Sequence, residues 1–565
     1  MNIKEKYEYW LAQVQDEELL AELQSVADAE ASLTDRFYRD LAFGTGGLRG
    51  ILGAGSNRMN IYTVAKATQG YCNYLRQHFA APSVAIAYDS RINSRLFAEV
   101  ATGLFAANGI LVHIYKQLMP TPALSYAVRQ LKCSGGIVIT ASHNPAQYNG
   151  YKVYGADGCQ ITTEAAAAIL AEIEKVDPFA DVQRLDFAAA LADSKVKYIA
   201  DSVIDEYLQA VSGESLLPAD VDRNVAIVYT PLNGTGISCV PRCLQENGFS
   251  NIVIPAEQAE PDGNFPTCPY PNPEVKEALA VGLQCAKEVG AELLLATDPD
   301  CDRVGAAVRN GDDYTLISGN EMGALLLDFV CQMRLQNGTM PAKPLAIKTI
   351  VTTPLAAKVA AHYGVEIIDV LTGFKFIGEQ IGLLESHDEA ERYIFGFEES
   401  YGYLSGSFVR DKDAVNASLL ICEMFAWYKQ QGKTLLYRLN EIYASFVYYS
   451  SRLLNFAFEG EAGAAKMAEL MRRLREKPPK DIAEYEVVQT RDYLIEETDS
   501  KIAVKLPKSD VLRYWLEKDC EVVVRPSGTE PKLKVYITAV GENRTASETL
   551  ADKLGAAVQD WFADE

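Results

Sequence analysis

Five times along this chain, an apolar, β-branched run gives way to a polar loop and then to a helical pattern. The runs span residues 84–88, 137–139, 225–229, 293–296 and 345–351. Strands that are apolar on both faces and alternate with helices are typical of parallel or mixed sheets covered on both sides. The recurrence predicts an α/β protein in which one kind of domain is used more than once.

The 565 residues are too many for one hydrophobic core. The spacing of residues 1–40 predicts one or two amphipathic helices packed against the main body. Near the end, the runs 521–524 and 533–537 and a helix beginning at a capping box, Thr545–Glu548, predict a small α+β domain. Breaks in the pattern place four domains at 1–212, 213–337, 338–456 and 457–565.

A net charge of −23 argues against nucleic acid or an anionic membrane as partner, because both need a basic surface. The N-terminus lacks the apolar core of a signal peptide, and no stretch reaches the roughly 18 apolar residues of a membrane span. The 11 cysteines are scattered and the 5 histidines are isolated, which predicts reduced thiols, a cytoplasmic protein and no zinc site. The oligomeric state is left open by the sequence.

The stretch Thr140–Pro145 follows the apolar run 137–139, so we expect Ser142 at the carboxyl end of a sheet strand. Ser142 offers a hydroxyl, His143 a proton carrier and Lys152 a cation. This combination indicates nucleophilic or phosphoryl chemistry. The alternative is an ordinary polar turn.

The stretch Asp298–Arg303 follows the run 293–296. In an extended segment, residues two apart point to one side, so Asp298, Asp300 and Asp302 would present their carboxylates together. Their repulsion calls for a cation, and a set of oxygen ligands selects Mg²⁺, Ca²⁺ or Mn²⁺. The alternative is a solvated acidic turn.

Five further loops have compositions suited to anions or sugars, and all but the last have a purely structural alternative as a turn or a surface charge. They are the glycine-rich loop 43–50 with Arg49, the loops Gly373–Lys375 and 410–413 with their lysines, the loop 397–402 with Glu398 and Ser400, and the phosphate-cradle composition of 525–532. Taken together, the loops fit the movement of a phosphoryl group on a phosphorylated polyol.

From Phe43 to the C-terminus, five of these motifs occur in an order that resembles the α-D-phosphohexomutase superfamily, and the loop order is similar to its cytosolic phosphoglucomutase branch. The resemblance implies three related α/β domains with mixed sheets and a smaller C-terminal α+β domain in a heart-shaped arrangement. One loop from each domain would meet in a central cleft.

The resemblance also implies roles. Ser142 matches the phosphoserine, which contributes to the metal site, and Asp298, Asp300 and Asp302 match the Mg²⁺ ligands. The substrate-binding positions it implies are Arg303, Lys375, Glu398, Ser400, Lys412, Arg525, Ser527, Gly528 and Thr529, while Arg49, His143 and Lys152 match catalytic positions in the cleft. Two departures are Cys301, where a small residue is expected, and Asn233, where histidine is expected.

The implied reaction interconverts glucose 1-phosphate and glucose 6-phosphate. Phosphorylated Ser142 donates its phosphoryl group to a hexose monophosphate, and glucose 1,6-bisphosphate turns over and returns the other phosphate. His143 or Lys152 would handle the proton. Phosphopentomutase or phosphomannomutase activity remains open, as does the different class of a non-catalytic sugar-phosphate sensor.

Overall fold

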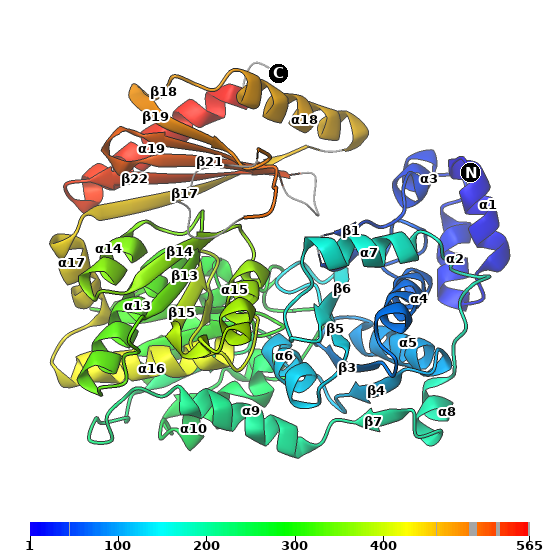
Figure 1. Cartoon of the computed structure of the whole chain (residues 1–565), viewed down its shortest axis with the longest axis horizontal. Coiled ribbons are helices and arrows are strands. Elements are labelled where there is room, and N and C mark those ends of the chain that lie inside the picture. The colour runs from blue at the N-terminus through cyan, green and yellow to red at the C-terminus, as the bar shows by residue number, and fades with distance from the viewer. Residues whose placement is uncertain (45, 459, 496–505, 527–531, 563–565) are drawn as a thin grey trace. The chain divides into compact units, whose positions relative to one another are not determined.

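The computed structural model describes residues 1–44, 46–458, 460–495, 506–526 and 532–562 (Figure 1). The chain forms two compact units. The first comprises Met1–Gly319, Phe374–Tyr393 and Ser400–Gln430, and the second comprises Asn320–Gly373, Ile394–Glu399 and the chain from 431 onward.

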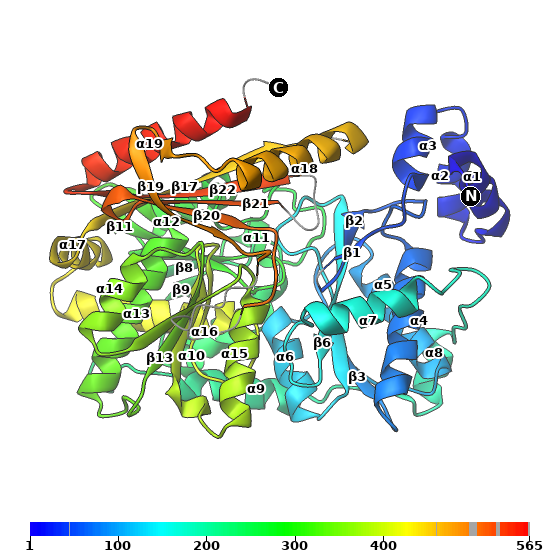
Figure 2. The same cartoon turned by 45° about the horizontal axis from the view of Figure 1, so that its top comes forward.

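A seven-stranded mixed sheet near the start of the first unit has the order β1-β2-β6-β5-β3-β4-β7. Its strands are β1 (Phe43–Gly44), β2 (Gly47–Ile51), β3 (Ser83–Tyr88), β4 (Leu111–Ile114), β5 (Gly135–Ile139), β6 (Tyr148–Gly155) and β7 (Val196–Tyr198). Its helices are α4 (Ile61–His78), α5 (Ser94–Ala107), α6 (Thr121–Gln130), α7 (Thr163–Ile173) and α8 (Phe187–Ala192). In both views, α5 and α6 lie on opposite sides of β3 and β5 (Figures 1 and 2). This coverage explains why every residue of β5 is buried.

A second sheet of the first unit has five strands in the order β12-β11-β10-β8-β9. Its strands are β8 (Ile227–Thr230), β9 (Ile252–Val253), β10 (Leu293–Thr297), β11 (Val304–Asn310) and β12 (Asp313–Ile317). The other elements of this unit are α9 (Asp201–Gly213), α10 (Val240–Glu246), α11 (Ala256–Ala259), α12 (Ala280–Val289), α15 (Phe374–Ser386), β16 (Gly402–Leu404) and α16 (Ala414–Gln430). Because β10 is parallel to β8 and antiparallel to β11, a chain reversal follows Thr297. That reversal carries the aspartates.

The N-terminal segment forms three helices, α1 (Ile3–Gln13), α2 (Glu17–Ser25) and α3 (Glu30–Phe37), where the sequence predicted one or two. Breaks at residues 14–16 and 26–29 divide the periodic pattern, and the Asp16 side chain caps α2. Trp10 is buried, with its ring 5.2 Å from that of Phe179 and 5.9 Å from that of Tyr62. The helices therefore pack against the main body, as predicted.

In the second unit, β14 (Glu366–Val370), β13 (Leu345–Thr349) and β15 (Tyr393–Glu398) are neighbours in that order. Three helices accompany them: α13 (Gly319–Gln336), α14 (Leu355–His362) and α17 (Leu435–Ser445). These elements continue the α/β pattern.

The chain ends in a six-stranded antiparallel sheet of order β17-β22-β21-β20-β19-β18. Its strands are β17 (Tyr448–Ala457), β18 (Asp481–Ile482), β19 (Tyr485–Asp492), β20 (Leu512–Leu516), β21 (Glu521–Pro526) and β22 (Lys532–Gly541). Helices α18 (Gly460–Glu476) and α19 (Arg544–Gln559) cover one face (Figure 2). The predicted cap of α19 at Thr545 is wrong, because Asn543 accepts the backbone N–H of Ala546 and starts the helix earlier.

Among the described residues, no helix combines the length and the apolar character needed to cross a bilayer. The predicted fold class, α/β domains with mixed sheets followed by a small α+β domain, is confirmed. The heart-shaped arrangement stays a prediction.

Candidate active site

The serine loop, residues 140–147, leaves the carboxyl end of β5 in the first unit; it is buried from Thr140 to Ser142 and exposed at Gln147. Ser142 has a left-handed backbone conformation with φ of 52° and is only 3% exposed. Its Oγ donates to Asp298 Oδ2 over 2.7 Å and lies 3.1 Å from His143 Nδ1. A non-glycine residue held in this region costs energy, so the surrounding contacts must fix the loop.

The metal loop, residues 298–303, is the chain reversal between β10 and β11. Its backbone is a tight turn in which Cys301 N donates to Asp298 O over 2.9 Å and Cys301 has φ of 53°. The expected extended geometry is therefore wrong. The carboxylates of Asp298, Asp300 and Asp302 still converge, with one oxygen of each within 4.8 Å of the others, because the turn curls them around a common centre.

The two residues that depart from the expected motifs, Cys301 in the metal loop and Asn233 in the loop after β8, both have left-handed backbone conformations. Glycine is the residue that adopts positive φ without strain, which is why a small residue is expected at position 301, and asparagine tolerates this region, as Asn233 does with φ of 56°. Cys301 is fully buried, and burial raises the pKa of its thiol well above the ordinary value. Because the thiolate is the form that oxidants attack, a buried thiol that stays protonated is poorly placed for oxidation.

The three aspartates have the chemistry of a cation site. Burial, followed by the charges of Asp300 and Asp302, raises the pKa of Asp298 well above its ordinary value. Within the described part of the chain, Asp300 Oδ1 and Asp302 Oδ1 are buried without a hydrogen-bond partner. Buried carboxylate oxygens that lack donors fit a hard divalent cation. Asp298, Asp300 and Asp302 would hold it, beside the Ser142 hydroxyl.

Two lysines from distant segments contact these carboxylates. Lys152, on β6, places Nζ 2.8 Å from Asp300 Oδ2 and 3.3 Å from Asp302 Oδ2, and Lys412 Nζ lies 3.1 Å from Asp302 Oδ2. A Cβ at Gly402 would lie 2.1 Å from Lys412 Cδ, so the glycine makes room for that side chain. Burial lowers the pKa of Lys152, but Asp300 and Asp302 outweigh it and raise the value overall.

His143 belongs to the serine loop, and Arg49 contacts that loop from β2. Burial, then Arg303 and Arg49, lower the pKa of His143 well below its ordinary value, so the imidazole is neutral at pH 7. Arg49 lies on β2 opposite Gly150 of β6, and its Nη1 donates to Asn144 Oδ1 over 3.2 Å. Arg303 follows the aspartates and pairs through Nη1 with Glu274 Oε1 at 2.7 Å. The first unit thus gathers every predicted catalytic and metal residue.

Sequence reasoning missed the residues that support the metal loop. Thr121, at the start of α6, donates its backbone N–H to Asp300 O and its hydroxyl to Asp300 Oδ2, each over 2.9 Å. Thr235 N donates to Pro299 O over 2.8 Å, and a Cβ at Gly234 would lie 2.4 Å from Pro299 Cα. The position of residues 231–236 directly after a predicted strand was the available signal. No local pattern marks Thr121 as a partner of Asp300.

The remaining predicted residues are divided between the two units. Lys375 is buried at the start of α15 and Ser400 is half-buried, both in the first unit. In the second unit, buried Glu398 accepts the backbone N–H of Gly373 over 3.0 Å. Ser527, Gly528 and Thr529 lie outside the described residues.

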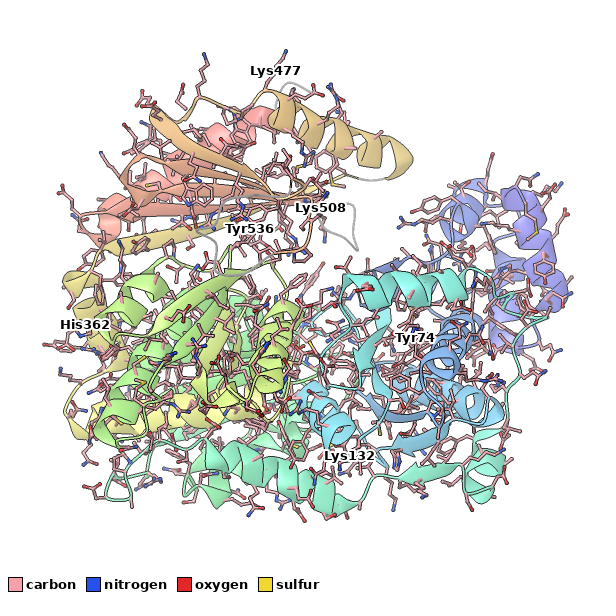
Figure 3. The ribbon with its side chains drawn as sticks, viewed as in Figure 1. Tyr74, Lys132, His362, Lys477, Lys508 and Tyr536 are labelled. Atoms are coloured by element: carbon pink, nitrogen blue, oxygen red, sulfur yellow. The ribbon has the colours of Figure 1, made fainter. Side chains whose placement is uncertain are left out.

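Arg525, also in the second unit, lies on β21. Its guanidinium interacts with the hydroxyl of Tyr536 on β22, which is labelled in Figure 3. The assembly of Glu398 and Arg525 around Ser142 stays a prediction.

A buried hydroxyl that contacts one carboxylate of a cluster of three, with Arg, Lys and His side chains beside these loops, is suited to moving a phosphoryl group with the help of a divalent cation. The fold and the site therefore define a metal-assisted phosphoryl-transfer enzyme of the α/β class.

Four family models match this chain in sequence order: phosphoglucomutase/phosphomannomutase α/β/α domain I at residues 40–179, domain II at 205–311, domain III at 318–446 and the C-terminal domain at 470–552. The chain therefore belongs to the phosphoglucomutase/phosphomannomutase family and is a mutase enzyme. The resemblance inferred from the motifs is confirmed, and so are the three α/β domains with a C-terminal fourth.

The sequences and a solved structure of known relatives support the same family assignment. The chain is 37% identical over 510 residues to a phosphoglucomutase of Staphylococcus saprophyticus, covering 89% of this chain and 91% of that one. It is 35% identical over 558 residues to a phosphoglucomutase of Staphylococcus aureus, covering 98% of each. A solved phosphoglucomutase/phosphomannomutase family protein of Burkholderia thailandensis has the same fold, with a TM-score of 0.67 at 19% identity over 92% of this chain and 97% of that one.

Proposed function

We propose that this enzyme interconverts glucose 1-phosphate and glucose 6-phosphate through a phosphoserine at Ser142 and a glucose 1,6-bisphosphate intermediate. The single observation that carries the proposal is the 2.7 Å contact between Ser142 Oγ and Asp298 within the carboxylate cluster. Phosphoglucomutase names at 35–37% identity over nearly the whole chain support the choice of glucose phosphates.

In the forward step, the substrate hydroxyl oxygen forms a bond to the phosphorus on Ser142 while the bond from phosphorus to Oγ breaks. The hydroxyl proton leaves to a base, and Oγ is reprotonated. Asp298, Asp300 and Asp302 are the residues that would hold Mg²⁺, which supplies charge to offset that of the transferring group.

His143 is our candidate for the base, because its Nδ1 lies 3.1 Å from Ser142 Oγ. Lys152, the rival candidate, is held by two carboxylates and remains charged. Arg49 and Arg303 are cations positioned to meet the phosphoryl group near these loops.

The further parts of the proposal concern substrate recognition and organisation. Lys375, Glu398, Ser400 and Lys412 would bind the sugar end, and Arg525, Ser527, Gly528 and Thr529 the phosphate that is not transferred. The two-step route calls for such a distant phosphate site, because the bisphosphate presents each end to Ser142 in turn. Domain boundaries near 212, 337 and 456 and a cytoplasmic location belong to the same proposal.

Two measurements test it. Mass spectrometry after incubation with glucose 1,6-bisphosphate should find phosphate on Ser142. Rates with glucose, mannose and ribose 1-phosphates, each with and without its bisphosphate, should favour glucose by about tenfold or more. Faster turnover of mannose or ribose phosphate would show that this sugar phosphate, and not glucose phosphate, is the preferred substrate. An enzyme that takes up no phosphate and turns over none of the three sugars would instead be a sensor.

A further inference from the structure

Arg91 is a buried arginine outside the residues discussed above, in the loop between β3 and α5. Its side chain is 0% exposed. Its Nη1 donates to Pro145 O and Tyr148 O, each over 3.0 Å, and its Nη2 donates to Ser142 O and Asn144 O. One guanidinium therefore binds four backbone carbonyl oxygens, three in the serine loop and one at the first residue of β6.

Asp89 and Phe265 contact Arg91 and hold it in place. The Asp89 carboxylate, also 0% exposed, accepts Arg91 N over 2.9 Å and the Ser94 hydroxyl over 2.6 Å, and its Oδ2 lies 3.5 Å from Arg91 Nε. The ring of Phe265 lies 5.0 Å from Arg91 Cζ. Asn149, just beyond the serine loop, donates to Ser94 Oγ over 3.0 Å. Burial lowers the pKa of Arg91 to about 10, so it remains a cation at neutral pH.

The loop has a reason to need such a contact. Ser142 occupies a left-handed conformation with φ of 52°, which is unfavourable for a residue with a Cβ. A change at this φ would swing the hydroxyl away from Asp298, which it contacts at 2.7 Å. The carbonyl of Ser142 is one of the four that Arg91 binds. The planar guanidinium offers a fixed fork of donors, and a lysine ammonium offers a single point charge.

We propose that Arg91 is a positioning residue that holds the backbone of the serine loop through its four carbonyl contacts and so aims Ser142 Oγ at the metal loop. Its donors are engaged by carbonyl oxygens, so Arg91 acts through Ser142 and not by contact with substrate. The inference rests on the proposed role of Ser142 as phosphoryl carrier.

The test compares Arg91→Lys with a matched control, Arg58→Lys. Arg58 has a side chain 9% exposed and donates Nη1 to the backbone oxygens of Asn57 and Asp35, far in sequence from the serine loop and the metal loop. Arg91→Lys should lower kcat about 100-fold or more with KM within about threefold, since misplacing a reacting group by about 1 Å costs that much. Arg58→Lys should lower the unfolding midpoint and leave kcat unchanged.

The ³¹P resonance of the phosphoenzyme separates positioning from a general loss of stability. Arg91→Lys should shift or broaden the phosphoserine signal, and Arg58→Lys should not. A kcat within threefold of that of the unsubstituted enzyme, with an unaltered resonance, would overturn the proposal.

If Arg91→Lys does not fold, the variant Asp89→Asn tests the proposal in its place. This variant keeps the Arg91 guanidinium and removes the negative charge of the Asp89 carboxylate beside it. A kcat loss of about tenfold or more then supports the proposal, and an unchanged kcat overturns it. The two proposals fail separately. If the unsubstituted enzyme takes up no phosphate on Ser142, the proposed role of Ser142 as phosphoryl carrier is refuted. If Ser142 is phosphorylated but Arg91→Lys leaves kcat and the resonance unchanged, only the positioning role of Arg91 is refuted.

Discussion

The serine loop and the metal loop each leave the carboxyl end of a buried strand, and each holds one non-glycine residue in a left-handed conformation, with φ of 52° at Ser142 and 53° at Cys301. Different groups hold them. Arg91 contacts the serine loop at its backbone carbonyl oxygens. Lys152 and Lys412 contact the metal loop at its carboxylates.

The difference reflects what each loop carries. Holding a loop by its backbone leaves the reacting hydroxyl available to change partners, as a phosphoryl carrier must. The metal loop carries three buried carboxylates that repel one another, so the side chains themselves need compensating charge. Damage to the serine loop should therefore affect the chemistry, whereas damage to the metal loop should affect the chemistry and cation binding together.

The largest effect comes from removing one functional group from each loop. Ser142→Ala and Asp298→Asn should each lower turnover by about 10⁴-fold or more, because each removes a group on which phosphoryl transfer depends. Their cation binding should differ. Mg²⁺ should still raise the unfolding midpoint of Ser142→Ala, with an affinity within about tenfold of the original, whereas Asp298→Asn should lose most of that stabilisation.

Thermal unfolding across a Mg²⁺ titration, run beside activity assays, checks this separation. The proposed division of roles between the two loops is contradicted if Ser142→Ala loses cation binding as completely as Asp298→Asn does. It is also contradicted if Ser142→Ala keeps a substantial fraction of turnover.

A smaller effect concerns the support behind the metal loop. Asp413 is buried at the start of α16, where it accepts the backbone N–H groups of Val415 and Asn416 and the Tyr207 hydroxyl, while Ala414 N donates to Cys301 O over 3.3 Å. Burial raises the pKa of Asp413 to about 6 from the ordinary 3.8. The folded protein therefore keeps a proton there that the unfolded chain releases.

Its contribution to stability is present below about pH 4 and lost as the pH rises through about 6, a change of about 1–3 kcal/mol. Asp413→Asn should make the decline in unfolding free energy over this range smaller by that amount, measured by urea unfolding with a chelator present. Asp186 is a matched control, since it caps α8 in the same manner but is exposed. Equal slopes for Asp413→Asn and Asp186→Asn would refute the expectation.

The smallest effect isolates the backbone strain of the metal loop. Cys301→Ala and Cys301→Gly both remove the buried sulfur, but only glycine adopts φ of 53° without strain. The glycine variant should have a free energy of unfolding equal to that of the alanine variant or up to about 1 kcal/mol higher, reversing the usual order of these two residues. Urea unfolding measures the difference. If Cys301→Ala is clearly more stable than Cys301→Gly, the backbone at position 301 carries little strain.

Local pattern predicted a large part of this protein. The apolar runs 84–88, 137–139 and 293–296 lie within β3, β5 and β10, and each loop that follows them contributes to the site. Ser142 and the three aspartates were singled out because a hydroxyl beside a histidine, and carboxylates at a spacing of two residues, each follow a buried apolar run. The extended geometry assumed for the aspartates was wrong, since sequence spacing does not reveal a left-handed residue such as Cys301.

The sequence by itself determined which strands are buried, which loops follow them and what chemistry those loops can support, because burial and residue type are properties written along the chain. Only the tertiary structure decided which groups meet: Ser142 with Asp298, Lys412 with Asp302, Thr121 with Asp300, and Arg91 with four carbonyl oxygens. Contacts between residues far apart in sequence depend on how sheets and helices pack. A backbone carbonyl, the group that Arg91 binds, is the same at every residue and leaves no mark in the sequence.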